Sequence, residues 1–216
     1  MKQPFSTISI LSVIFVFLFN STTNAQDQKT DGLSVDFVEH TSEKRIDVMI
    51  DNELFTSLKW PEGVYKPVLH PILTSAGTII TRGYPLKPRK GERPDHMHHV
   101  GNWMNYGNVD GFDFWGNGHT GKKSKNGGEI KLLEVEKLNP GKGEGSMVTK
   151  AVWEDPKGNE LLMEKTVYHF ITVGNIRIID RVTALTARNK TVKFNDTKEG
   201  MFAIRVNRQL ELPSEG

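Results

Sequence analysis

The chain has 216 residues, of which 25% are charged and 37% are hydrophobic, and its formal net charge is +2. This composition suffices for one globular domain with an apolar core. The near balance of charge, without a dense Lys/Arg tract, argues against nucleic acid as a partner. The chain has no cysteine, which excludes disulfides, thiol nucleophiles and thiolate metal sites.

Residues 1–25 have the pattern of a secretory signal peptide. Lys2 supplies a positive start, and the mostly apolar run 8–19 is shorter than the about 20 residues that a membrane-spanning helix needs. Thr23-Asn24-Ala25 offers small residues for cleavage, although an uncleaved N-terminal anchor is the alternative. We therefore expect a periplasmic or secreted protein without stable membrane insertion after cleavage, and a flexible N-terminus at residues 26–32.

The domain proper, residues 33–216, is predicted to consist of strands and turns. Apolar and polar residues alternate, with turn signals between the runs, in the segments 34–39, 45–50, 53–60, 129–137, 147–154, 161–173, 176–186 and 202–212. No convincing amphipathic helix interrupts them, so we predict an all-β fold, an antiparallel β-sandwich. Because a strand leads directly into the last residues, we expect the sandwich to be incomplete at Gly216.

The middle segment, residues 61–128, is rich in proline and glycine and lacks a helical period. It also contains aromatic residues, which a structureless linker would not need. We predict that this segment forms long functional loops over one face of a sheet.

Four of the seven histidines lie in the stretch 95–119 of this segment, three of them within four positions: His96, His98, His99 and His119. Histidine titrates near neutral pH, transfers protons and binds metals, so this stretch is the best candidate for a site. In an extended chain the i, i+2 spacing would put His96 and His98 on one face and His99 on the other. With a nearby carboxylate, His96 and His98 would then suit a divalent metal; a hydrogen-bonded cluster that orders the loop is the alternative.

Three sequence blocks resemble a bacterial family of unknown function known as PmoA-like. They are Thr81-Arg82-Gly83-Tyr84-Pro85, the histidine stretch 95–103 with its continuation 108–115, and a later block that includes 196–200 and 204–206. The resemblance covers about residues 60–216. The name "methane oxygenase" does not transfer, because the membrane oxygenase subunit has several spans and this chain has none after its signal. The predicted sandwich is similar to carbohydrate-active folds such as the galactose-mutarotase-like supersandwich, a fold-level analogy.

The resemblance implies a site assembled from both motif blocks. We expect His96, His98 and His99 to act as acid or base together with the carboxylate of Glu199 or Asp196, which otherwise read as part of a solvated turn. Crowding of the imidazoles should lower the pKa of at least one of them. The predicted substrate-binding residues are Arg82, Trp103, Asn105, Asp113, Trp115 and Arg205. Tryptophans would serve as sugar platforms and arginines as carboxylate clamps, unless they form core and ion pairs.

These residues predict a secreted carbohydrate-active protein, a hydrolase or an epimerase-like enzyme that binds a carbohydrate ligand or substrate. A non-catalytic carbohydrate-binding module is the first alternative, since tryptophans alone can bind sugars. A metal-dependent oxidoreductase is the second, as the family label suggests. The cofactor, the sugar and the bond are not specified by the sequence.

Overall fold

The computed structural model describes residues 32–117 and 122–212. The predicted signal peptide, residues 26–31 and His119 lie outside the described residues. In the described part of the chain, no helix has the length and apolar character needed to cross a membrane.

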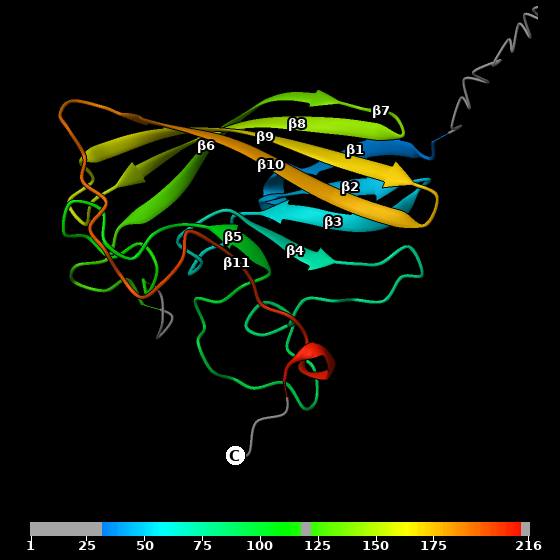
Figure 1. Ribbon diagram of the computed structural model, residues 1–216, viewed down its shortest axis with the longest axis horizontal. Helices are drawn as coiled ribbons and strands as arrows, with labels where there is room; N and C mark the ends of the chain where they lie inside the picture. The colour runs from blue at the N-terminus through cyan, green and yellow to red at the C-terminus, as the bar shows by residue number, and fades with distance from the viewer. Residues whose placement is uncertain (1–31, 118–121, 213–216) are drawn as a thin grey trace, which may run out of the picture.

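The protein folds as two antiparallel β-sheets, so the predicted all-β sandwich is confirmed (Figure 1). The larger sheet has seven strands in the order β11-β5-β4-β3-β2-β1-β7. Their bounds are β1 Ser34–His40, β2 Arg45–Ile50, β3 Glu53–Lys59, β4 Val68–Ile72, β5 Asn102–Met104, β7 Gly141–Lys142 and β11 Phe202–Ile204. Asp51 and Asn52 join β2 to β3 with φ of 47° and 65°, the conformation that a tight hairpin turn requires.

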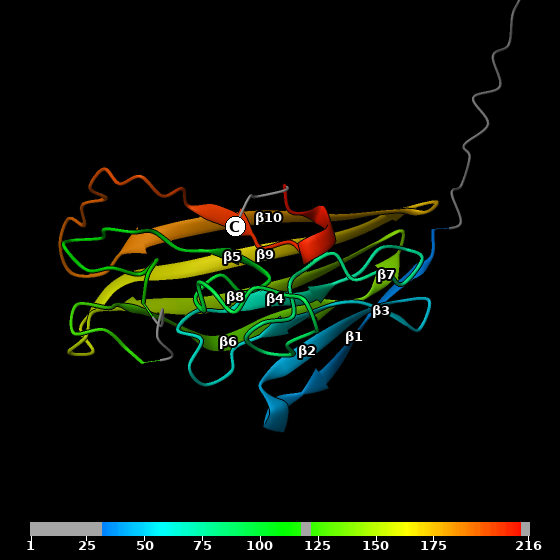
Figure 2. The same cartoon turned by 90° about the horizontal axis from the view of Figure 1, so that it is seen from below.

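The smaller sheet has four long strands in the order β10-β9-β8-β6. The strands are β6 Glu129–Asn139, β8 Glu144–Glu154, β9 Glu160–Val173 and β10 Ile176–Ala187. Gly174 and Asn175 connect β9 and β10 as the sequence predicts, and all of β10 pairs with β9, from Val173 back to Leu162. In Figure 2, seen from below, the strands of the two sheets overlap.

An apolar core lies between the two sheets. In β2, Ile46 and Val48 are buried in this core, and they alternate with Arg45 and Asp47, which therefore face outward. From the opposite sheet, Phe170 of β9 contacts Phe55 edge-on, with ring centroids 6.3 Å apart. The outward face of β2 and β3 is the one over which part of the following segment folds.

The segment between β3 and β6 differs from the prediction in one respect, because it contributes two strands as well as loops. β4 and β5 extend the larger sheet beyond β3, and residues 79–89 lie over the outward side chains of β2 and β3. Gly101 permits the close approach of β4 and β5: its φ is 58°, and an added Cβ would lie 2.2 Å from the Leu69 carbonyl oxygen. The predicted loops over one sheet face are therefore observed. The segment also contains two strands that its proline-rich sequence did not indicate.

The predicted last strand, 202–212, is shorter than expected. Only Phe202–Ile204 form β11, which pairs with β5, and a 3-10 helix follows at Arg208–Leu210. Asn207 caps this helix by accepting a hydrogen bond from the Gln209 amide, so the chain turns away from the sheet. The pairing of β11 with β5 brings the second motif block to the first.

Candidate functional site

The three neighbouring histidines lie on a tight turn and not on an extended strand. His96 has φ of 43°, and the His99 amide donates to the His96 carbonyl oxygen at 2.8 Å. The His99 ring centroid lies 5.0 Å from that of His96 and 4.2 Å from that of His98. The predicted placement of His99 on the opposite face is therefore wrong, because the turn gathers all three rings.

Arg82 stabilises this turn through hydrogen bonds to its backbone. Its side chain is 1% exposed, and its guanidinium donates to the carbonyl oxygens of Arg93, His96 and His99 at 3.0 to 3.1 Å. Its Nη1 also donates to Asp95 Oδ1 at 2.5 Å. With Nη1 and Nη2 both committed to the protein, Arg82 cannot clamp a ligand carboxylate as predicted, and the alternative of a structural ion pair is correct.

Asp95 is the carboxylate that lies within the histidine cluster. Its Oδ1 accepts from Arg82 and, at 3.1 Å, from Arg205 Nη2, while Oδ2 lies 3.1 Å from His96 Nδ1. Partial burial raises the pKa of Asp95, but the His96 hydrogen bond and the two guanidinium charges outweigh it, so the pKa falls below its usual value. Arg205 also pairs with Glu211 at 2.9 Å, so it too serves a structural network.

The electrostatics of the cluster favour a neutral His99. Burial lowers the pKa of His99 to about 4, and the charges of His96 and Arg205 add to the effect. This confirms the expected direction for one histidine, although burial contributes more than the like charge of its neighbour. The His96 side chain is 50% exposed, and its Nδ1 lies 3.1 Å from Asp95 Oδ2.

Lys66 is an unusual residue beneath the cluster that sequence reasoning missed. The residue is only 3% exposed. Its amine donates to the His98 carbonyl oxygen at 2.7 Å and lies 5.3 Å from the Trp103 ring centroid. Burial lowers the pKa of Lys66 to about 7, against a smaller opposing effect of Asp113. A single lysine between Tyr65 and a proline gives no sequence signal of this burial.

The predicted sugar platforms are core residues. Trp103 is 1% and Trp115 9% exposed, and they pack on each other with ring centroids 5.6 Å apart. Neither presents a free face to a sugar, so this prediction is wrong. The other two tryptophans are also structural, since Trp153 is fully buried and Trp60 packs, partly buried, against the core between the sheets.

The two polar residues predicted to bind substrate also have structural roles. Asn105 is fully buried and donates to the Phe114 carbonyl oxygen at 2.7 Å. The Asp113 carboxylate caps a turn by accepting from the amides of Trp115 and Gly116 at 2.8 and 2.9 Å. Both residues fix the loop backbone.

Asp196 and Glu199 do not join the histidines as predicted. The antiparallel register places Met201 beside Asn105 and Arg205 beside Gly101, so Glu199 lies beyond one end of this pair and His99 beyond the other. At about 3.3 Å per residue the separation is on the order of 20 Å. Asp196 is exposed, and Glu199 contacts Lys198 at 3.6 Å, which agrees with the alternative of a solvated turn.

A divalent metal at His96 and His98 gains no support from the geometry. No group of three or more His, Asp or Glu side chains in the described ranges is arranged to hold a metal ion. The one carboxylate in the cluster, Asp95, already faces two guanidinium groups, whose charge disfavours a cation at that point.

A pocket on the outward face of the larger sheet also escaped the sequence prediction. Its volume is about 410 Å³, and its polar lining comes from Arg45, Asp47, Ser57, Lys59, His70, Lys87 and Arg89. The available signal was the placement of Arg45 and Lys59 at outward positions of paired strands, followed by the basic run Lys87-Pro88-Arg89-Lys90. Only the fold shows that these positions meet.

Fold and cluster together define a β-sandwich protein with a surface histidine–aspartate pair over a buried arginine. Residues 45–216 match the model of a family of unknown function (DUF6807), and the chain belongs to that family. No curated protein and no solved structure matches the chain. The sequence resemblance therefore stands as membership of a family of unknown function, and the name PmoA-like gains no support.

Proposed function

We propose that the protein is an exported carbohydrate-active enzyme that transfers protons at a sugar through His96, His99 and Asp95. The observation that carries the proposal is the His96–Asp95 pair, with 3.1 Å between Nδ1 and Oδ2. Asp95 replaces Glu199 and Asp196 as the carboxylate of the site. Export rests on the signal-like N-terminus, and the sugar rests on the resemblance of the sandwich to carbohydrate-active folds.

The pair has the arrangement that a general acid requires. Asp95 is anchored by Arg82 and Arg205, so it can orient the His96 imidazole and provide the counter-charge for an imidazolium. Because Asp95 faces Nδ1, a proton exchanged with a ligand would pass through Nε2 of His96. Because the His96 side chain is 50% exposed, a ligand on the surface can contact the ring.

His99 has the complementary property. Its lowered pKa keeps the imidazole neutral near pH 7, which is the form that accepts a proton. The His96 and His99 rings are stacked, with an interplanar angle of 15° and centroids 5.0 Å apart. A base and an acid this close suit ring opening at an anomeric centre, where the base takes the hydroxyl proton and the acid protonates the ring oxygen.

The two competing functions have less support. A binding module would need exposed aromatic faces, whereas Trp103 and Trp115 are buried. A metal-dependent oxidoreductase would need a set of metal ligands, and the arginines beside Asp95 work against one. Of the three functions, an epimerase-like reaction is the one in which the charges of His96 and Asp95 would have a role.

The test is a screen of the purified full-length gene product on reducing sugars, with anomer exchange followed by NMR, and on oligosaccharides, with cleavage followed by chromatography. We expect His96→Gln and Asp95→Asn to reduce turnover at least about a hundredfold, the usual contribution of a general acid or base. His169→Gln is the matched control, since His169 also pairs with a carboxylate, Glu144, at 2.6 Å. Full turnover in His96→Gln, or sugar binding without any turnover, would contradict the enzyme.

A further inference from the structure

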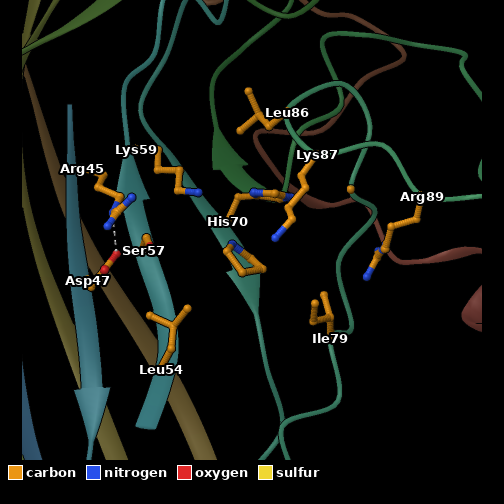
Figure 3. Close-up of a pocket in the computed structure, with 12 residues that line it drawn as sticks. Arg45, Asp47, Leu54, Ser57, Lys59, His70, Ile79, Leu86, Lys87 and Arg89 are labelled. Atoms are coloured by element: carbon orange, nitrogen blue, oxygen red, sulfur yellow. Dashed lines mark hydrogen bonds and ion pairs between the residues drawn. The ribbon is translucent and has the colours of Figure 1, made fainter. Parts of the chain in front are cut away.

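The pocket on the outward face of the larger sheet is a second, separate feature (Figure 3). Lys59 comes from β3 and His70 from β4, while Lys87 and Arg89 come from the loop that folds over them. The pocket has a volume of about 410 Å³, which suits a ligand the size of a monosaccharide. Apolar side chains, Leu54, Ile79 and Leu86 among them, line the rest of the pocket.

Two of the four cationic side chains in the pocket already have partners. Arg45 contacts Asp47 at 3.2 Å and also pairs with Glu43. Arg89 Nη2 lies 2.6 Å from Glu92 Oε1, and Arg89 also donates to the Thr81 carbonyl oxygen. These two guanidinium groups are therefore balanced by carboxylates of the protein.

The two lysines are not balanced. Within the described residues, neither the Lys59 nor the Lys87 amine has a hydrogen bond or ion pair. In Figure 3 both amines point toward His70, one from each side of the pocket. Burial lowers the pKa of Lys59, and the charges of Arg45 and Lys87 outweigh the opposing charge of Asp47. The pocket thus holds two lysine amines that no carboxylate of the described residues contacts.

His70 adds a second polar group without a partner. It is 3% exposed, and its Nε2 donates to the Arg82 carbonyl oxygen at 3.1 Å, which leaves Nδ1 as an acceptor. In the described part of the chain this buried Nδ1 has no hydrogen-bond partner. A buried polar atom without a partner in the protein is rare, and a bound water, ion or ligand can supply the missing partner.

We propose that this pocket binds a small organic oxyanion of up to monosaccharide size, held between the amines of Lys59 and Lys87. The carbon skeleton packs on the apolar lining, and a hydroxyl next to the anionic group reaches toward Nδ1 of His70 when the lysine side chains shift. A carboxylate, a sulfate ester and a phosphate ester share the required chemistry. The anion site stands on the pocket alone; that the ligand is a sugar rests on the proposed function.

The experiment is calorimetric titration of the full chain with D-glucuronate, glucose 6-sulfate, glucose 6-phosphate and glucose. We expect one of the three anionic sugars to bind at least about tenfold more tightly than glucose, since a charge-assisted contact is worth more than a neutral one. Lys59→Met and Lys87→Met should each weaken that binding by about tenfold or more. Lys157→Met, in the exposed turn between β8 and β9, should leave the binding unchanged.

A second readout follows the lysine itself. After reductive ¹³C-methylation, the NMR titration of Lys59 should move to higher pH when the ligand is bound, because a neighbouring anion favours the ammonium form. Equal affinity for glucose and for all three anions, or unchanged binding in both lysine variants, would overturn the proposal. If inorganic sulfate or phosphate binds as tightly as the anionic sugar, the proposal that the ligand is organic is wrong. If His96→Gln loses turnover but still binds the anion, the histidine cluster and the anion pocket are separate sites, and each proposal can be tested without the other.

Discussion

The apolar core between the sheets and the polar cluster around the buried Arg82 side chain are stabilised by different interactions. In the core, Ile46, Val48 and Phe170 contribute by removing apolar area from water, which is non-directional. In the polar cluster, Arg82 orders a turn through directed hydrogen bonds to three carbonyl oxygens and one carboxylate. The core therefore tolerates exchange among apolar residues of similar size, whereas the cluster depends on one side chain.

The largest expected effect follows from removing that side chain. Arg82→Met keeps much of the volume but removes one of the two guanidinium partners of Asp95 and the buried donor to three carbonyl oxygens, which should cost about 3–5 kcal/mol of unfolding free energy. Urea denaturation measures the loss, and hydrogen exchange should show that the amides around residues 93–99 lose protection first.

The matched change in the apolar core is Leu58→Ala, at a fully buried position of β3. It should cost about 2–5 kcal/mol and lower the protection of the whole sandwich, without a selective effect on the histidine turn. If Arg82→Met unfolds as uniformly as Leu58→Ala does, the polar cluster is not a distinct unit of stability.

The same contrast explains how much the sequence predicts. Alternation gave β2, β6 and the β9–β10 hairpin, because a strand with one buried face shows a period of two. It missed β4, where Pro71 interrupts the pattern, and β5, which has only three residues. Short central strands such as β5 carry too few positions for a period to show.

For the site, the sequence identified the residues that come together but not their roles. His96, His98, His99, Arg82 and Arg205 do gather, although Arg82 proves structural and Glu199 lies elsewhere. The positive φ of His96 decides which way the rings face, and a histidine at that position does not indicate such a backbone conformation. Likewise, the pocket between Lys59 and Lys87 depends on a loop returning across the sheet, which local patterns do not encode.

A second prediction concerns Lys66, which lies beneath the polar cluster. With its pKa lowered to about 7, folded Lys66 binds fewer protons than the unfolded chain between about pH 7 and 10. The stability of the wild type relative to Lys66→Met should therefore rise with pH across this window, by roughly 1 kcal/mol per pH unit. Urea denaturation at pH 7, 8.5 and 10 measures the difference, and a constant difference would mean that Lys66 stays protonated in the fold.

The smallest expected effect links the polar cluster to the pocket through His70. Its pKa is lowered to about 4 by burial and by the charge of Lys59, so the folded protein keeps this ring neutral where the unfolded chain protonates it. Between about pH 6.5 and 4 the unfolded state binds more protons, and stability falls as the pH falls. Relative to His70→Gln, the wild type should lose on the order of 2 kcal/mol across this window.

Thermal or urea unfolding at pH 6.5, 5.5 and 4.5 tests this, with His169→Gln as the control at a surface histidine. The His70→Gln curve should lose stability less steeply than the wild type on acidification, because the glutamine amide keeps a donor for the Arg82 carbonyl oxygen and has no proton to gain. An anion bound between Lys59 and Lys87 should reduce the difference, since its charge favours a protonated His70 in the folded state as well. Parallel curves for the wild type and both variants would show that His70 is protonated in the fold at these pH values, and the neutral acceptor assigned to the pocket would then be wrong.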